Sequence, residues 1–239
     1  MRISSIEEWD RFSRPNKKDG LATRSEPALP EGIDNDKSYS QRAQNQDFYL
    51  LERTALKSRV LIVEGISGSG KDTFQTHLKK KLEGQEVYDY SEGEVLHSWK
   101  QLQIEGILEL RIKFMKCFVN YVRDTVNRDE NAIFLLNRFH LSTYASTIIQ
   151  QPKLEKEYNE ILDILRTLPI HVFILQVDTD EIEKRSLHPE RSLAWQKFQQ
   201  KIVGQDSFRD RLEKQQALIL EAAKRQRIPY SVIKVSCEL

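Results

Sequence analysis

The sequence predicts a three-layer α/β fold, in which a five-stranded parallel sheet carries helices on both faces. Two observations lead to this prediction. Five short apolar segments alternate along the chain with segments of helical periodicity, an order typical of parallel sheets covered by crossover helices. A glycine-rich segment of the form G-x4-G-K joins the first of these strands to the helix after it. A mostly irregular N-terminal arm is expected to precede the sheet.

By composition, the 239 residues divide into a short arm and a larger domain. Residues 1–45 are polar and contain several prolines, which indicates an irregular arm or linker. Apolar side chains recur at every third position near its start, at Ile3, Ile6, Trp9 and Phe12. That spacing predicts a short amphipathic helix. Two interpretations stay open: a partly disordered tail, or a helix that docks on a partner or on the domain itself. The α/β domain is expected to span residues 46–239.

The elements of the domain follow from apolar periodicity. Short apolar runs predict strands at 59–64, 86–90, 132–136, 170–177 and 231–235. Helices are expected at 47–57, 72–82, 94–103, 105–127, 141–151, 153–167, 180–185, 192–202 and 205–227. Apolar residues along 105–127 recur at spacings of three and four, so one face of this long helix is apolar. That face could fill the core of a monomer or pack a homodimer.

Composition excludes several classes of protein. The chain has 37 Lys and Arg residues against 36 Asp and Glu, a formal net charge of +1, so bulk nucleic-acid binding is not expected. Its two cysteines, Cys117 and Cys237, exclude a disulfide framework and a CxxC metal site. No apolar run reaches the roughly 18 residues of a membrane span, and the N-terminus lacks the apolar core of a signal peptide. We therefore expect a cytoplasmic protein with no membrane partner.

The segment between the first strand and its helix is the strongest functional signal. Consecutive backbone N–H groups can wrap a phosphate chain only where the residues tolerate unusual dihedral angles and carry no bulky Cβ. The following helix directs its positive end at the phosphates, and the lysine adds a point charge. The predicted ATP-binding residues are Gly65, Ser67, Gly68, Ser69, Gly70, Lys71, Asp72 and Thr73.

The position after the lysine departs from the usual pattern. A Ser or Thr normally stands there, and its hydroxyl meets Mg²⁺. Here Asp72 takes that position and Thr73 follows, and both are candidate metal ligands. The Asp72 carboxylate could bind the metal, directly or through water, or it could repel the phosphates.

Three motifs resemble those of P-loop nucleoside and nucleotide kinases, above all thymidylate kinases and the deoxynucleoside kinases. The letters E-G-I-S-G-S-G-K at 64–71 resemble the thymidylate kinase opening EGxDGxGK, and the Gly-Lys-x-Thr ending resembles that of adenylate kinases. L-L-N-R-F-H-L-S at 135–142 resembles the D-R-Y/F/H motif, and 178–191 resembles a strand end, helix start and arginine-bearing lid. The resemblance covers about residues 58–236. It implies a P-loop kinase fold, ATP and Mg²⁺ as cofactors, and a nucleotide or nucleoside acceptor.

The resemblance also implies roles for single residues. Lys71 would hold the donor phosphates, and Arg138 would grip the acceptor or the transferring phosphoryl group. Arg185 and Arg191 would be lid arginines that neutralise charge in the transition state. The chain departs from the family at two positions, since Ser67 and Asn137 stand where thymidylate kinases have Asp. Magnesium handling should therefore differ, and Asp72 is a hypothetical replacement for one lost charge.

The acceptor site is predicted from the segment after the second strand and from the long helix. Glu92 and Glu94 are candidate catalytic bases, because deoxynucleoside kinases place a glutamate there. Trp99, Phe114 and Tyr121 are candidates to contact the acceptor base, together with Asn137 and Arg138. Plain structural alternatives remain: an acidic residue favoured at a helix N-terminus for the glutamates, and ordinary core for the aromatics.

Three functions are compatible with these residues. The first is an ATP-dependent kinase of a nucleoside or nucleoside monophosphate, with the choice between a hydroxyl and a phosphate acceptor left open. The second is a nucleotide-binding regulator or NTPase on the same fold, suggested by the absent carboxylates at Ser67 and Asn137. The third is a kinase of another small molecule, because P-loop kinases share one architecture across acceptors.

Overall fold

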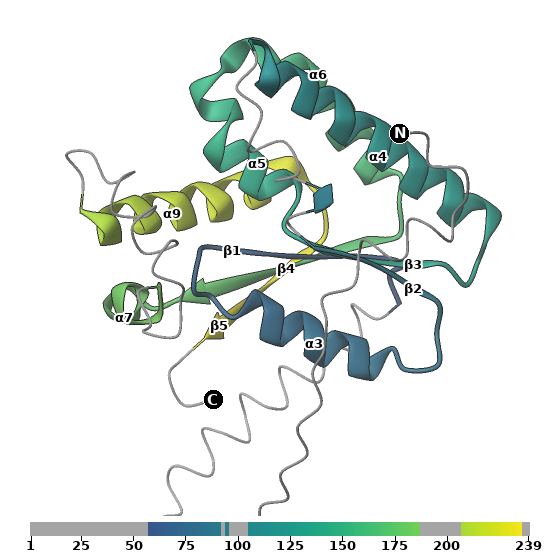
Figure 1. Cartoon of the computed structure of the whole chain (residues 1–239), viewed down its shortest axis with the longest axis horizontal. Coiled ribbons are helices and arrows are strands. Elements are labelled where there is room, and N and C mark those ends of the chain that lie inside the picture. Colours follow the sequence, from purple (N-terminus) through teal and green to yellow (C-terminus); the bar gives the residue numbers. More distant parts are fainter. Residues whose placement is uncertain (1–56, 92–93, 96–104, 187–206, 236–239) are drawn as a thin grey trace, which may run out of the picture. The chain divides into compact units, whose positions relative to one another are not determined.

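A computed structural model describes residues 57–91, 94–95, 105–186 and 207–235 (Figure 1). Its five strands form one parallel sheet in the order β2-β3-β1-β4-β5. The strands are β1 (Val60–Gly65), β2 (Val87–Tyr90), β3 (Ile133–Asn137), β4 (Ile170–Val177) and β5 (Tyr230–Val235). The predicted α/β fold and all five predicted strands are confirmed, because each predicted apolar run forms a strand within one or two residues of its expected bounds.

Helices cover both faces of the sheet. The α-helices are α3 (Lys71–Lys81), α4 (Ile107–Arg128), α5 (His140–Ser146), α6 (Glu155–Arg166), α7 (Ile182–Ser186) and α9 (Phe208–Gln226). Short 3₁₀ turns are η2 (Ile148–Gln150), η3 (Pro152–Leu154) and η4 (Thr179–Glu181). Figure 1 shows α3 below the sheet and α4, α5, α6 and α9 above it. Successive residues of a strand point to opposite faces, so Val60 and Ile62 enter the upper core and Leu61 and Val63 the lower one.

The register of the sheet brings distant segments to one edge. Val63 of β1 pairs with Asn137 of β3, and Gly65 of β1 pairs with Leu175 of β4. The carboxyl ends of these parallel strands therefore meet. The chain visits β2 and β3 on one side of β1 and β4 and β5 on the other, and such a switch point leaves a crevice at the carboxyl edge. The glycine-rich loop lies at this edge.

Several helix bounds differ from prediction. The helix expected at 141–151 is wrong in its second half, because α5 ends at Ser146 and a 3₁₀ turn follows. Three β-branched residues, Thr147, Ile148 and Ile149, disfavour helix there, and Pro152 limits the conformation of the residue before it. Pro152 opens a second 3₁₀ turn, so α6 begins only at Glu155. The arm at 1–45, the helix at 192–202 and most of those at 47–57 and 94–103 lie outside the described residues.

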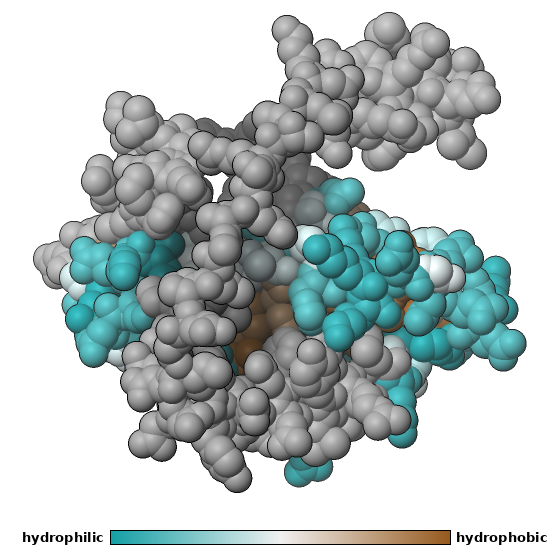
Figure 2. All heavy atoms as spheres, turned by 90° about the horizontal axis from the view of Figure 1, so that it is seen from below, coloured by the Kyte–Doolittle hydropathy of each residue, from teal (hydrophilic) through white to brown (hydrophobic). Residues whose placement is uncertain are grey.

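No helix within the described ranges combines the length and apolar character that crossing a membrane requires. From below, the described surface is mostly hydrophilic on its two flanks, with an apolar area between them (Figure 2).

Candidate functional site

The loop between β1 and α3 has the backbone that its glycines predict. Gly65, Gly68 and Gly70 have φ values of 148°, 80° and 83°. The loop curls around Lys71, which is only 7% exposed and whose Nζ donates to the Ile66 carbonyl at 2.7 Å. Gly70 caps α3 without a side-chain hydrogen bond. The first N–H groups of a helix have no intrahelical acceptor, so this end of α3 is suited to an anion.

The end of α7 packs directly on this loop. Ser186 Oγ donates to the Ser67 carbonyl at 2.8 Å, and Arg185 Nε donates to the Gly68 carbonyl at 3.3 Å. A Cβ at Gly68 would lie 2.9 Å from the Arg185 carbonyl oxygen and 2.8 Å from Ser186 Oγ. A glycine is therefore favoured at position 68 for two reasons: the backbone is left-handed there, and α7 approaches too closely to leave room for a Cβ.

Gly68→Ala is expected to destabilise the protein by about 2–4 kcal/mol, because left-handed strain of ~1–2 kcal/mol adds to the clash with α7. Gly84→Ala is the matched control, because Gly84 has a φ of 85° and no atom within 4 Å of a built Cβ. The control variant should lose only the ~1–2 kcal/mol of stability that left-handed strain costs. Denaturant unfolding of both variants measures the difference, and equal losses would contradict the close packing of α7 on the loop.

Arg185 is the predicted lid arginine that the structure describes. Its guanidinium lies over the loop, with NH2 3.7 Å from a Cβ built at Gly70, and NH1 is 3.5 Å from Glu181 Oε2. The Arg185 side chain is 19% exposed. Arg185 and Lys71 thus bring two cationic side chains to one short loop. The second predicted lid residue, Arg191, lies outside the described residues.

Asp72 and Asn137 face each other across the start of α3 and the end of β3. Asn137 Nδ2 donates to Asp72 Oδ1 at 2.6 Å. Asn137 is 6% exposed, and its Oδ1 is buried without a hydrogen-bond partner among the described residues. Thr73 is exposed in the first turn of α3. Carboxylate, amide and hydroxyl oxygens are the hard donors that Mg²⁺ prefers, so Asp72, Asn137 and Thr73 fit such an ion. No cluster of three His, Cys, Asp or Glu residues occurs in the described ranges.

Arg138 follows Asn137 in a strained conformation. Its φ is 62°, in the left-handed region that residues with a Cβ rarely adopt, and its N–H donates to the Val63 carbonyl at 2.9 Å. Such strain costs about 1–3 kcal/mol and is common at functional sites. The conformation places the predicted acceptor-binding arginine at the carboxyl edge, beside the loop.

The sequence prediction missed the role of Glu64. This residue of β1 is fully buried, and its Oε1 accepts hydrogen bonds from the N–H groups of Phe139, Leu141 and Ser142 at 2.9, 3.0 and 3.3 Å. Ser142 Oγ donates to Oε2. Burial raises the pKa of Glu64, against the opposing effect of hydrogen bonds from Ser142 and Phe139. A glutamate inside an otherwise apolar strand was the available signal. Glu64 fixes the N-terminus of α5 to β1 and thereby positions the Asn137–Arg138 segment.

The two predicted aromatic residues of α4, Phe114 and Tyr121, lie at different distances from the carboxyl edge of the sheet. Tyr121 is 43% exposed and packs edge-on to Phe134 of β3, with ring centroids 5.7 Å apart. Its hydroxyl pairs with Tyr90; burial, and then this hydrogen bond, raise the pKa of Tyr90. Phe134 lies four residues before Arg138, so Tyr121 is displaced from the carboxyl edge.

Phe114 lies closer to that edge, beside an aromatic residue that sequence reasoning missed. The ring of Phe118 has its centroid 6.5 Å from that of Phe114, 5.0 Å from Tyr90 at the end of β2 and 5.8 Å from Phe139 after β3. The i, i+4 spacing of Phe114 and Phe118 was the signal for this pair. Together they form an aromatic wall near the strand ends.

Comparison with known proteins finds solved structures of similar fold. The crystal structure of thymidylate kinase from Ehrlichia chaffeensis is similar to this chain, with 18% sequence identity, a TM-score of 0.47, and coverage of 74% of this chain and 90% of that chain. No protein-family model matches the chain, and no curated protein matches its sequence. At this identity the likeness concerns the fold alone and assigns neither a substrate nor a residue role.

Of the residues predicted after β2, the structure describes only Glu94. Its Oε2 accepts from the Ser91 N–H at 2.7 Å and from Ser91 Oγ at 2.6 Å, while its own N–H donates to Ser91 Oγ at 3.3 Å. This reciprocal pairing is a capping box, which matches the structural alternative weighed for this residue. Its role as a base stays a prediction. Glu92 and Trp99 lie outside the described residues.

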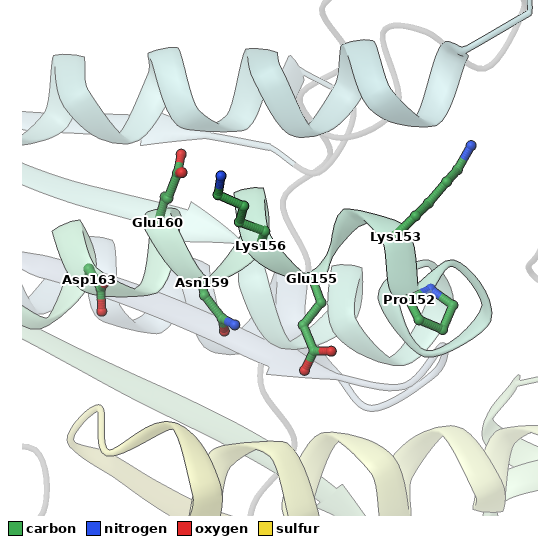
Figure 3. Close-up of a pocket in the computed structure, with 7 residues that line it drawn as sticks. All are labelled: Pro152, Lys153, Glu155, Lys156, Asn159, Glu160 and Asp163. Atoms are coloured by element: carbon green, nitrogen blue, oxygen red, sulfur yellow. The ribbon is translucent and has the colours of Figure 1, made fainter.

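A surface depression of about 570 Å³ along α6 does not belong to this site. Its lining residues are Pro152, Lys153, Glu155, Lys156, Asn159, Glu160 and Asp163. Figure 3 shows their side chains diverging to opposite sides of the helix rather than converging on one point. Two of the charges are already paired across to α4, Lys153 with Glu109 and Glu160 with Lys116, each at 2.5 Å. No residue of the loop or of the β3 end lines it.

Proposed function

We propose that the protein is an ATP-dependent phosphotransferase that moves the γ-phosphoryl group of ATP to a nucleoside or a nucleoside monophosphate. The observation that carries the proposal is the convergence of two cationic side chains on one glycine-rich loop. Lys71 comes from the start of α3, and Arg185 comes from α7 and donates to the Gly68 carbonyl at 3.3 Å. Backbone N–H groups, a lysine and an arginine on one loop suit a transferring phosphate.

Each of these groups has a place in the reaction. The loop N–H groups and Lys71 hold the β- and γ-phosphates of the donor, and Arg185 neutralises charge on the transferring phosphoryl group. Arg138, held at the strand end, orients the acceptor. Asp72 and Asn137 would hold a magnesium ion at this loop, and the ion would offset negative charge on the phosphates. Catalysis then comes from positioning and charge neutralisation rather than from a covalent intermediate.

The acceptor would lie between Arg138 and the aromatic wall of Phe114 and Phe118. Aromatic rings together with an arginine would suit a nucleobase that carries a ribose hydroxyl or a phosphate. A monophosphate acceptor needs a cation such as Arg138 but no base. A hydroxyl acceptor needs a base within hydrogen-bond reach, and Glu92 is the candidate for it now that Glu94 pairs with Ser91.

Transfer of labelled phosphate from ATP to a panel of nucleosides and nucleoside monophosphates tests the proposal. We expect product from one acceptor class, and Lys71→Ala should lower the rate by at least about 10²-fold. Lys80→Ala is the matched control, because Lys80 is an exposed lysine at the other end of α3 and should leave the rate unchanged. Product formation that survives Lys71→Ala would contradict the role of the loop.

One observation favours a second candidate, a nucleotide-binding regulator or NTPase. The strand end offers the Asn137 amide where a carboxylate was expected, and that amide is engaged by Asp72. Binding of ATP that depends on Lys71, without transfer to any acceptor of the panel, would favour this alternative. A kinase of another small molecule would instead show turnover stimulated by an acceptor outside the nucleotide panel.

A further inference from the structure

The carboxylate of Asp72 stands where it opposes the proposed ligand. Asp72 directly follows Lys71 in the first turn of α3, at the mouth of the phosphate-binding loop. A nucleoside triphosphate would bring several negative charges to within a few ångströms of it. Like charges at that distance repel strongly, even with the screening found near a protein surface. A phosphate loop with an uncompensated carboxylate would bind nucleotide poorly unless a cation came between them.

A second residue fixes Asp72 in that position and leaves an oxygen donor beside it. Asn137 Nδ2 donates to Asp72 Oδ1 at 2.6 Å, so the amide end of Asn137 lies at the carboxylate. Asn137 is more than nine-tenths buried, and its Oδ1 has no hydrogen-bond partner among the described residues. A buried carbonyl oxygen normally has a partner. The unused acceptor therefore points to a ligand with positive charge or a donor group.

We propose that Asp72 and Asn137 form the cation-binding element of this loop and make nucleotide binding conditional on a divalent cation. This inference rests on the proposed function. Without the cation, Asp72 repels the phosphates; with it, the carboxylate and the phosphates share one ion. Asn137 is a positioning residue that orients the carboxylate and adds its own oxygen.

The carboxylate can be moved from position 72 to position 137 by two substitutions that together leave the net charge of the protein unchanged. Asp72→Ser removes the carboxylate from the helix, and Asn137→Asp places one on the strand end. The double variant carries a hydroxyl on α3 and a carboxylate on β3, at the same two positions. If the two residues act as a unit, Asp72→Ser should weaken the cation dependence of nucleotide binding, and the double variant should restore it.

The experiment measures binding of a fluorescent, non-hydrolysable ATP analogue to the full chain, once in EDTA and once in Mg²⁺. We expect Mg²⁺ to raise the affinity of the wild-type protein about 100-fold. Asp72→Ser should lower this ratio roughly tenfold, because binding in EDTA tightens and binding in Mg²⁺ weakens. The isosteric Asp72→Asn should do the same, and the double variant should restore the ratio. Asp124→Asn, which changes an exposed aspartate of α4, is the matched control and should leave it unchanged.

Binding of Mn²⁺ followed by electron paramagnetic resonance gives a second readout that needs no turnover. Linkage requires the nucleotide to raise Mn²⁺ affinity by the same factor by which the cation raises nucleotide affinity. In Asn137→Asp two carboxylates lie at hydrogen-bond distance, so Mn²⁺ should bind even without nucleotide, and thermal stability should fall in EDTA and recover with Mn²⁺.

The outcomes separate this inference from the proposed function. Nucleotide binding that is lost in Lys71→Ala, but with equal cation dependence in the wild type and in both Asp72 variants, would overturn the inference and leave the proposed function standing. Loss of cation dependence in Thr73→Ala would assign the ion to the hydroxyl instead. No nucleotide binding by the wild type with any cation would overturn both.

Discussion

Replacing Arg185 with alanine should lower kcat for phosphoryl transfer about 10²–10³-fold, the loss typical of removing one group that stabilises charge in a transition state. Arg185 contacts the loop through the Gly68 carbonyl, and its NH2 lies near Gly70. Its ion pair with Glu181 holds the guanidinium in place at little conformational cost. Charge that develops on a phosphoryl group at this loop would lie close to the Arg185 guanidinium.

Steady-state kinetics of Arg185→Ala should therefore show a larger change in kcat than in the KM for ATP. Arg185→Lys keeps the charge but loses the planar fork, so it should recover only part of the rate. Arg209→Ala is the matched control: Arg209 pairs with Asp180 at 3.2 Å and with Glu213 at 2.7 Å beside α7, but has no contact with the loop. A change confined to KM, or an equal loss in the control, would mean that Arg185 acts only in binding or stability.

The parts of the molecule that the sequence predicted are those fixed by local rules. Strand β4 was expected at 170–177 and is found there, because six of its eight residues are apolar and four of these are β-branched, a composition that favours a buried strand. The loop was predicted from its glycines, the lysine after them and the flanking strand and helix, and left-handed backbone at Gly68 and Gly70 favours residues without a Cβ. The signals lay within a few residues of the features they predicted.

The contacts that make the candidate site depend on residues far apart in the sequence. Asp72 and Asn137 are 65 positions apart, and Glu64 lies 75 to 78 positions from the N–H groups it accepts from. Only the register of β1 against β3 brings them together. No local pattern encodes that register. The sequence could suggest that Asp72 replaces a lost charge, but its pairing with Asn137 appears only in the folded chain.

Glu64→Ala is expected to cause the largest loss of stability, about 3–5 kcal/mol. The variant would leave three buried backbone donors at the start of α5 without an acceptor, at ~1–3 kcal/mol each, with partial relief if water enters. Ser142→Ala is the graded control, because it removes only the hydroxyl that donates to Oε2 and should cost about 1 kcal/mol. Denaturant unfolding gives both values. A loss no larger than that of Ser142→Ala would show that Glu64 does not fix α5 to the sheet.

Glu64→Gln separates the charge of this residue from its hydrogen bonds. The amide oxygen can still accept from Phe139 and Leu141, and the Ser142 hydroxyl can rotate to accept from the amide, so most of the stability should remain.

Burial raises the pKa of Glu64 above its ordinary 4.5, so the unfolded chain loses this proton at lower pH than the folded chain does. The stability that Glu64 contributes is thus full below pH 4.5 and is lost as the pH rises through the folded pKa. The glutamine variant cannot ionise and should gain stability relative to the wild type over that interval. If its stability instead fell relative to the wild type as pH rose, the ionised carboxylate would be the form that the α5 N-terminus favours, and the hydrogen bonds from Phe139, Leu141 and Ser142 would outweigh burial.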